Sequence, residues 1–171
     1  MTTSFIVIDH AAASRLWRDY ARARPEAAAS DSAFTVEHFG DTPELADELL
    51  HAVLGGRKRA TSALVREFTV DGDPRPRIGM HVIVCDGRGT PRVILRTVEL
   101  RIGDFGSVDD KFAADEGGRD RTLDGWRAGH RRYFTRVSSA WQTPWSESED
   151  IVFERFRVVW PPALADAAST D

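Results

Sequence analysis

Cysteine and lysine are scarce in this chain. It has a single cysteine, Cys85, which excludes a disulfide within the chain. Because Cys85 stands in the apolar run HVIVCD, we expect a buried thiol rather than a nucleophile. Only two of the 23 basic residues are lysines, Lys58 and Lys111, so guanidinium groups, which suit paired contacts with phosphate, carry nearly all of the positive charge. A coding bias toward arginine is the simpler explanation of this count.

Long hydrophobic segments are also lacking. No apolar run approaches the roughly 20 residues that a membrane-spanning helix requires. The first residues, MTTSFIVIDH, hold four apolar residues in a row with no basic residue before them, unlike a secretory signal. We therefore expect a cytoplasmic protein with no membrane partner. The formal net charge of -4 argues against nucleic-acid binding driven by bulk charge, but it leaves room for a local basic patch.

The motifs of metal and nucleoside-triphosphate chemistry are missing as well. The stretch LHAVLGGRKRAT has neither the spacing nor the order of a phosphate-binding P-loop, and the chain has no Gly-x-Ser-x-Gly elbow. The histidines do not have ligand spacing. They are His10, His38, His51, His81 and His130. We expect no bound metal and no cofactor.

Length and composition predict a single domain, and short strands around a hairpin with helices outside predict the α+β class. With 171 residues, of which 42% are hydrophobic, the chain is long enough to bury one core. Residues 11–24 predict an N-terminal helix that Pro25 ends, followed by a loop. An Ala-rich tail follows Pro161 and Pro162, and we expect it to be frayed.

Within the domain, capping signals and periodicity predict helices and strands. Asp41 to Glu44 starts a helix that Gly55 ends, and Thr122 starts a second, amphipathic one, with a short helix around 107–115 between them. FTVEHFG and IVFERFRVVW predict strands, and IGMHVIVCD with PRVILRTVELRI predicts a hairpin. In this hairpin Arg96 shares the more apolar face, where a charge requires a partner or a ligand.

The stretch GGRKRAT places three cations directly behind a helix end. Arg57 and Arg59 are expected to lower the pKa of Lys58, since they disfavour a third positive charge. A neutral Lys58 amine could then deprotonate the Thr61 hydroxyl and create a nucleophile. The same stretch could instead bind phosphate, or it could be a solvated basic turn, which the pattern taken alone favours.

Four stretches together resemble the ASCH domain family, within the PUA-like superfamily. They cover roughly 34–160 and read FGDTPELADELLHAVLGGRKRATSAL, RTVELRIGDF, EGGRDRTLDGWRAGHRRYF and VFERFRVVW. The resemblance implies a PUA-like small β-barrel flanked by helices, here with an extra N-terminal helix. It divides the chain into an N-terminal helical extension at 1–33, an ASCH domain at 34–160 and a frayed C-terminal tail at 161–171. It also implies that the loop 56–61 faces a cleft suited to RNA or a modified nucleoside.

The family resemblance implies two kinds of chemistry. Some members remove the acetyl group from acetylated cytidine with the motif lysine and threonine and a strand glutamate, and others are ribonucleases. Lys58 and Thr61 match the motif, but aligning ILRTVEL with the family's IETTEV puts Arg96 where that glutamate stands. A guanidinium removes the proton acceptor and adds an anion-binding charge. Glu99 is expected on the opposite strand face and is a poor substitute for the acid unless a β-bulge intervenes.

The sequence thus predicts an RNA- or nucleotide-binding domain with a cationic cleft, and hydrolysis of single-stranded RNA stays open. An amidohydrolase acting on an acylated nucleoside and a non-catalytic RNA-binding adaptor are the alternatives. Anion binding is assigned to Arg57, Lys58, Arg59 and Arg96. The candidate catalytic residues are Lys58, Thr61, His130 and Tyr133. Trp126 could stack on a base, although a core position suits Trp126 and His130 slightly better.

Overall fold

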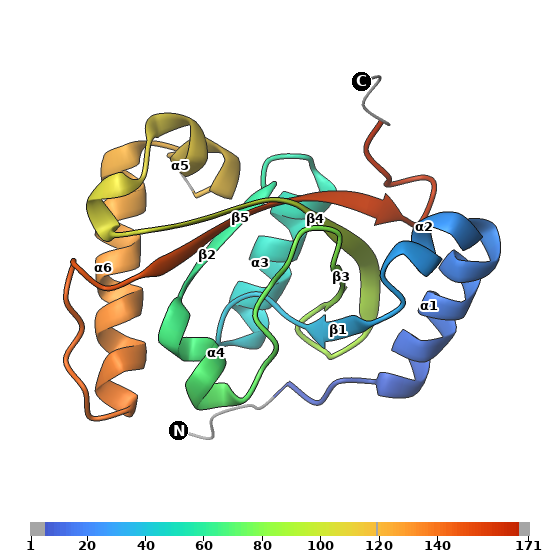
Figure 1. The fold of residues 1–171 in the computed structure, drawn as a ribbon, viewed down its shortest axis with the longest axis horizontal. Helices are drawn as coiled ribbons and strands as arrows, with labels where there is room; N and C mark the ends of the chain where they lie inside the picture. Colours follow the sequence, from blue (N-terminus) through green and yellow to red (C-terminus); the bar gives the residue numbers. More distant parts are fainter. Residues whose placement is uncertain (1–5, 119, 168–171) are drawn as a thin grey trace. The chain divides into compact units, whose positions relative to one another are not determined.

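The computed structural model describes residues 6–118 and 120–167, and the chain divides into two compact units (Figure 1). The first unit comprises 1–56, 77–98 and 156–171, and the second comprises 57–76 and 99–155. The strands form one five-stranded sheet with the hydrogen-bonded order β1-β3-β4-β5-β2. Strands β4 (Pro91–Gly103) and β5 (Ile151–Trp160) each have residues in both units.

The first unit holds three helices and three strands besides its part of β5. Its helices are α1 (His10–Ala23), α2 (Pro25–Ser30) and α3 (Pro43–Leu54). Its strands are β1 (Phe34–Glu37), β3 (His81–Cys85) and the first part of β4. Strand β1 pairs parallel with β3, and β3 pairs antiparallel with β4.

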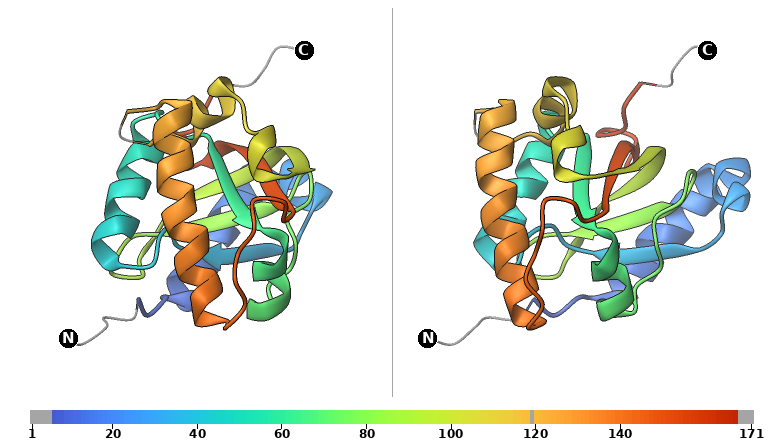
Figure 2. Two further views of the ribbon diagram at one scale, coloured as in Figure 1. Left: turned by 90° about the vertical axis from the view of Figure 1, so that its left-hand side faces the viewer. Right: turned by 60° about the vertical axis from the view of Figure 1, so that its left-hand side comes forward.

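Helices cover both faces of these strands. Ile83 and Ile94 pack with Tyr20 of α1 in one buried cluster. Val84 and Val93, their neighbours in sequence, pack in a second cluster with α3, through residues that include Val53. Because side chains alternate between the faces of a strand, α1 and α3 cover opposite faces of β3 and β4 (Figure 2).

The capping signals give the expected helix ends. Thr42 caps α3 by accepting from the backbone N–H of Leu45, and the helix ends at Gly55. Pro25 ends α1, as expected, but it also opens α2, because proline suits the first turn of a helix. The expected loop after Pro25 is therefore wrong over Pro25–Ser30, where the small residues form a short helix.

The predicted hairpin is confirmed as β3 and β4. Ile83 lies opposite Ile94, and His81 lies opposite Arg96. Residues directly opposite in an antiparallel pair share a face, so Arg96 lies on the same face as buried His81. This is the face that α1 covers.

The second unit consists of short elements around one apolar cluster. They are β2 (Ala60–Leu64), α4 (Val65–Asp71), the second part of β4, a 3-10 turn η1 (Phe105–Ser107), α5 (Asp110–Glu116), α6 (Leu123–Ala140) and the first part of β5. Strand β2 pairs antiparallel with β5, with Thr61 opposite Glu154. The cluster unites Leu64, Phe105 and Phe134 with Phe153 of β5. Its packing fixes β2 beside α5 and α6, the elements that carry the site.

The expected fold class, α+β with a PUA-like, barrel-like sheet, flanking helices and an N-terminal helix, is confirmed. In the expected tail, the backbone N–H of Asp166 donates to the carbonyl of Val158, and the Asp166 carboxylate accepts from the N–H of Val158. Positions 168–171 lie outside the described residues. No helix in the described ranges is long and apolar enough to cross a membrane.

Candidate functional site

Lys58 is a buried residue of the second unit, with only 3% of its surface exposed. Its ammonium donates to the backbone carbonyl of Ala60 at 2.8 Å and to the backbone carbonyl of Glu116 at 3.3 Å. The first bond closes a turn at the start of β2. The second connects this turn to the end of α5. Lys58 therefore anchors the loop that the sequence singled out.

Further contacts fix the flanking arginines of this loop. The backbone N–H of Arg59 donates to the carbonyl of Asp115 at 2.7 Å, and its guanidinium donates to the carbonyl of Lys58 at 2.8 Å. Gly117, directly after α5, packs against this loop. It has a left-handed φ of +79°, and a Cβ there would lie 2.8 Å from the carbonyl oxygen of Arg57. Only glycine suits this close approach. The Arg57 side chain is exposed and that of Arg59 half-buried.

Glu116, the last residue of α5, is the buried acid of the site. Its carboxylate accepts from the backbone N–H of Ser62 at 3.1 Å and from the Ser62 hydroxyl at 3.0 Å. The indole N–H of Trp126 donates to Oε2 at 2.5 Å, and Nε2 of His130 lies 3.1 Å from Oε1. Buried polar groups are stable when hydrogen-bonded, and this carboxylate has partners on two elements, Ser62 on β2 and both Trp126 and His130 on α6.

The hydroxyl that reaches this acid belongs to Ser62, not to the motif residue Thr61. Alternate residues of β2 are buried, which puts Ser62 on the inner face and half-buried Thr61 on the other. Thr61 shares that other face with its strand partner Glu154, since directly opposite residues point the same way. The sequence pattern of the motif indicated a loop. Because Thr61 instead lies on a strand, its hydroxyl and the Ser62 hydroxyl that bonds to Glu116 point to opposite faces.

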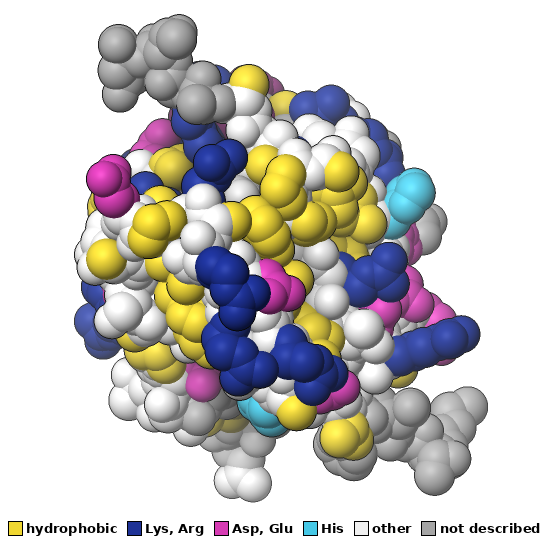
Figure 3. Space-filling view, turned by 90° about the vertical axis from the view of Figure 1, so that its right-hand side faces the viewer, with side chains coloured by type: hydrophobic (Ala, Val, Ile, Leu, Met, Phe, Trp, Pro, Cys, Tyr) yellow, Lys and Arg dark blue, Asp and Glu magenta, His cyan; other side chains and the backbone are white. Residues whose placement is uncertain are grey.

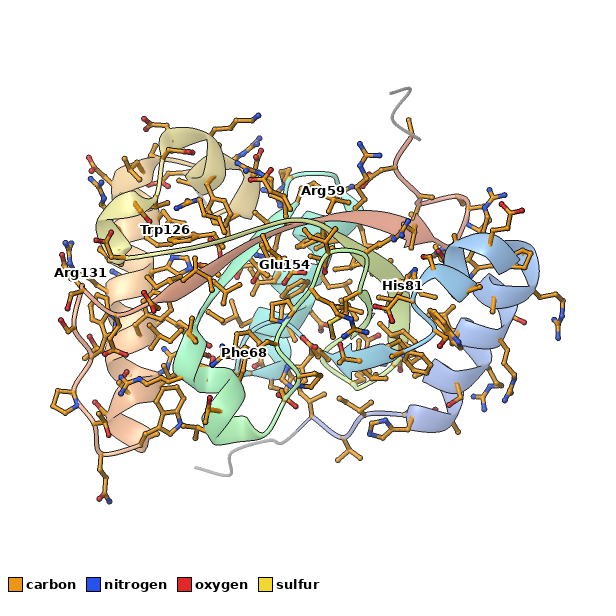
Figure 4. All side chains as sticks on the ribbon, viewed as in Figure 1. Arg59, Phe68, His81, Trp126, Arg131 and Glu154 are labelled. Atoms are coloured by element: carbon orange, nitrogen blue, oxygen red, sulfur yellow. The ribbon has the colours of Figure 1, made fainter. Side chains whose placement is uncertain are left out.

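Trp126 and His130 stack on each other within α6. Their ring centroids lie 4.0 Å apart with an interplanar angle of 15°, and Nδ1 of His130 lies 3.0 Å from the backbone carbonyl of Trp126. Trp126, which Figure 4 labels, is a residue of α6. It is 6% exposed and belongs to the apolar cluster. The His130 side chain remains 19% exposed. Trp126 thus offers little ring surface to a base, whereas His130 connects Glu116 to solvent.

Tyr133 is engaged elsewhere in the second unit. Its hydroxyl donates to Oε2 of Glu67 at 2.9 Å, and Oε1 of Glu67 accepts from the backbone N–H of Leu64. Tyr133 therefore supports the junction of β2 and α4. The structure does not bring its hydroxyl to Glu116, whose acceptors are occupied by Ser62 and α6.

Arg96 and Glu99, both on β4, fall in different units with different partners. Arg96, in the first unit, donates to the hydroxyl of Ser30 at 3.0 Å. Glu99, in the second, accepts from the guanidinium of Arg155 at 2.6 Å, and Arg155 also bonds to Asp115 at 3.0 Å. Neither residue bonds to the carboxylate of Glu116. A carboxylate at the end of α5, rather than one on β4, is therefore the acid of this site.

The burial of the site shifts the pKa of both Lys58 and Glu116. Burial lowers the pKa of Lys58, and the charges of Glu116 and Glu154 oppose that shift. The expected direction is thus found, but its cause is burial rather than the neighbouring arginines. Burial alone would raise the pKa of Glu116, but the charge and hydrogen bond of His130, together with Lys58 and Trp126, lower it to about 2.

Sequence reasoning missed Glu116 and Ser62. Glu116 stands before two glycines, and a helix that ends in Glu-Gly-Gly is a weak signal for an acid placed at a turn. Ser62 follows the motif threonine directly and would be found only by recognising 60–64 as a strand. Among the residues that the structure describes, no three His, Cys, Asp or Glu side chains gather as a metal site.

Comparisons with known proteins agree with this architecture. The family model of the ASCH domain matches residues 35–160. The structure of an ASCH domain from Lactobacillus crispatus is 24% identical, with a TM-score of 0.82, over 92% of this chain and 99% of that one. A protein from Enterococcus faecalis with the family model DUF984 is 27% identical, with a TM-score of 0.77, over 86% of this chain and 88% of that one. A search of curated proteins gives no significant match.

Proposed function

The chain belongs to the ASCH domain family, and on that premise we propose that it binds RNA or a nucleotide through the basic loop 57–59. The family membership makes a nucleic-acid ligand reasonable. The observation that carries the proposal is the fixed loop itself, in which buried Lys58 holds two arginines at the surface of the second unit.

Rigidity is what makes this loop suitable for binding. Its backbone is tied to α5 through Arg59, and its side-chain amine is tied to β2 and α5 through Lys58. A binding group that is ordered before the ligand arrives loses less conformational entropy on binding. Two guanidiniums on such a loop present planar donor groups that suit phosphate oxygens.

Burial decides which residues of the loop we propose as ligand contacts. Lys58 is buried, and the charge of Glu116 acts on it. Direct contact of Lys58 with phosphate is therefore less favourable than contact through the arginines beside it. Arg57 is exposed and Arg59 half-buried, so these two are the ligand contacts that we propose. In this scheme Lys58 is a positioning residue.

Binding of a fluorescent octauridylate at low salt tests the proposal with the full chain. The double variant Arg57→Ala/Arg59→Ala should bind at least about tenfold more weakly, since each lost charge-assisted hydrogen bond contributes that order. It should also flatten the salt dependence of log K by about 1.4, the value for two phosphate contacts of a single strand. Arg88→Ala/Arg132→Ala, which removes two exposed guanidiniums elsewhere, is the matched control. Equal affinity of the two double variants for octauridylate would contradict the proposal.

Hydrolysis is the second candidate, and the lowered pKa of Lys58 is the observation that favours it. In a deacylation, the Thr61 hydroxyl would form an ester with the acyl group as the amide C–N bond breaks. The amine would leave with a proton, and water would release the acid. Binding ranks higher, because Glu116 is saturated by hydrogen bonds and the Lys58 amine already donates to two carbonyls.

Acetate release from acetylcytidine and cleavage of single-stranded RNA, both followed between pH 6 and 9, test this candidate. Thr61→Val keeps the shape of the side chain and removes the hydroxyl, so it should abolish acetate release if Thr61 is the nucleophile. The absence of both activities in the wild type would remove hydrolysis and leave a non-catalytic RNA-binding adaptor. Turnover that Thr61→Val abolishes would instead rule out the adaptor.

A further inference from the structure

Arg96 occupies an unusual position in the first unit. It lies on the α1-covered face of β4, opposite His81, which is fully buried. Its guanidinium reaches out of this face toward α2, where Nη2 donates to the hydroxyl of Ser30 at 3.0 Å. Nε lies 3.5 Å from the carbonyl oxygen of Gly79. Both partners are neutral.

The charge of Arg96 is not balanced by an acid. Within the described ranges no carboxylate oxygen lies within ion-pair distance of it, and three of its five N–H groups have no protein acceptor. A half-buried charge gains stability from a partner of opposite sign. The side chain of Arg96 is half-buried, and a Cβ at Gly79 would lie in ordinary van der Waals contact with Nη2, at 3.5 Å, a position that glycine leaves empty.

More positive than negative charge surrounds this group. Arg24, at the junction of α1 and α2, is exposed, and both Arg24 and Arg96 act electrostatically on Tyr20. Arg77 is half-exposed and is balanced by Asp31, at 2.6 Å. Figure 3 shows the face that carries α1 and α2, on which Lys and Arg side chains gather. The exposed arginines of α1 are Arg15, Arg18 and Arg22.

We propose that Arg96, with Ser30 beside it, forms a phosphate-binding site in the first unit, distinct from the basic loop of the second. The phosphate would be carried by a nucleotide or by an RNA strand. It would accept from the free N–H groups of Arg96, which offer the planar pair of donors that matches two phosphate oxygens. The exposed guanidinium of Arg24 would add to the attraction.

This site depends on the N-terminal helices. Ser30 ends α2, and both α1 and α2 precede the residues 35–160 that the family model matches. Arg96 of β4 and the helix that supplies Ser30 therefore meet at one place. The inference does not rest on the proposed function, since phosphate can bind at Arg96 even if the loop 57–59 binds nothing.

Phosphate titrations followed by the Nε–H signal of Arg96 in NMR spectra test the site directly in the full chain. Wild-type protein should show a saturable shift of this signal. Arg96→Gln should weaken phosphate binding, measured by calorimetry, at least about tenfold, because a charged hydrogen bond contributes that order. Arg92→Gln, on the same strand but paired with Asp86, should change it less than about twofold, as exposed pairs contribute little.

The affinities of three ligands, inorganic phosphate, adenosine 5′-monophosphate and octauridylate, distinguish the possible sources of the phosphate. Adenosine 5′-monophosphate that binds more tightly than inorganic phosphate identifies a nucleotide, and octauridylate that binds more tightly than both identifies a strand. If Arg96→Gln does not fold, Arg96→Lys keeps the charge but loses the paired donors and should still bind phosphate more weakly. The absence of a shift in wild type, or equal affinity of the Arg96 variant, overturns the inference. Arg57→Ala/Arg59→Ala should leave the Arg96 shift unchanged, which separates this site from the loop.

Discussion

The hydroxyl of Ser62 lies 3.0 Å from Oε2 of Glu116, a residue 54 positions further along the chain. This bond joins β2 to the end of α5 through a buried carboxylate that also meets Trp126 and His130, while Lys58 donates to the backbone carbonyl of the same residue. The site therefore rests on a hydroxyl that the family motif does not contain. Thr61, which the motif does contain, is on the outer face of the same strand.

The two neighbouring hydroxyls should differ sharply in their effect on stability. Ser62→Ala leaves one donor fewer on a buried carboxylate and should lower the free energy of unfolding by about 1.5–3 kcal/mol. Thr61→Ala should lower it by less than about 1 kcal/mol, because Thr61 is only half-buried and lies on the face of β2 opposite to Ser62. Urea unfolding of both variants measures this difference. Equal losses would contradict the assignment of Ser62 to the inner face.

Lys58 and Glu116 should be energetically coupled. Removing one charge of a buried pair costs about 3–5 kcal/mol, because the other charge is left without its partner. We expect losses of this order from Lys58→Met and from Glu116→Gln, and a double variant that loses clearly less than the sum. A double-mutant cycle by urea unfolding gives the coupling. Additive losses would show that the two charges do not interact.

Acid should weaken the fold through Glu116. Its pKa in the folded protein is about 2, below the usual 4.5, so the unfolded chain binds more protons between these values. The contribution is complete above pH 4.5 and is lost as the pH falls toward 2. It amounts to about 3 kcal/mol. The stability difference between wild type and Glu116→Gln should shrink over this window, and a constant difference would refute the lowered pKa.

A second pH effect should arise in the first unit, at His81. Nδ1 of His81 lies 3.1 Å from the carbonyl oxygen of Asp31, which can only accept, so Nδ1 carries the proton and Nε2 accepts from Tyr20. The neutral ring is thus satisfied. Burial lowers the pKa of His81 below its usual 6.5, in spite of the hydrogen bond to Asp31.

The sign of this effect follows from the lowered value. Below pH 6.5 the unfolded chain binds a proton that the folded chain does not, so stability is full above pH 6.5 and falls as the pH drops below it. The loss is at most about 1.4 kcal/mol per pH unit. Wild type should lose stability relative to His81→Phe between pH 7 and 5, whereas exposed His10→Gln should follow wild type. Parallel profiles of wild type and His81→Phe would disprove it.

Local signals were sufficient for most of the fold. The Thr42 cap and Gly55 delimited α3, and Thr122 and the apolar spacing gave α6, because caps and periodicity act over a few residues. The short helix α2 was missed because Ala, Ser and Glu after a proline resemble a loop. Its Ser30 turned out to be the partner of Arg96, so that omission also hid the environment of the arginine.

The site itself depends on contacts that no local pattern contains. Ser62, Glu116 and His130 are brought together by packing of β2, α5 and α6, and their spacing in sequence carries no sign of this. Buried and half-buried residues alternate along β2, but over only five residues. This pattern was too short to indicate a strand next to a motif that suggested a catalytic loop. The sequence predicted a lowered pKa for Lys58, but the burial that causes it is a property of the packed unit.

The burial of Lys58 also has a practical use. The chain has only two lysines, and Lys111 on α5 is exposed whereas Lys58 is 3% exposed. An amine-reactive fluorophore should therefore label one lysine side chain, on the helix that ends at Glu116. Among the lysine side chains, labelling would thus select one defined position close to the candidate site, without any engineered cysteine.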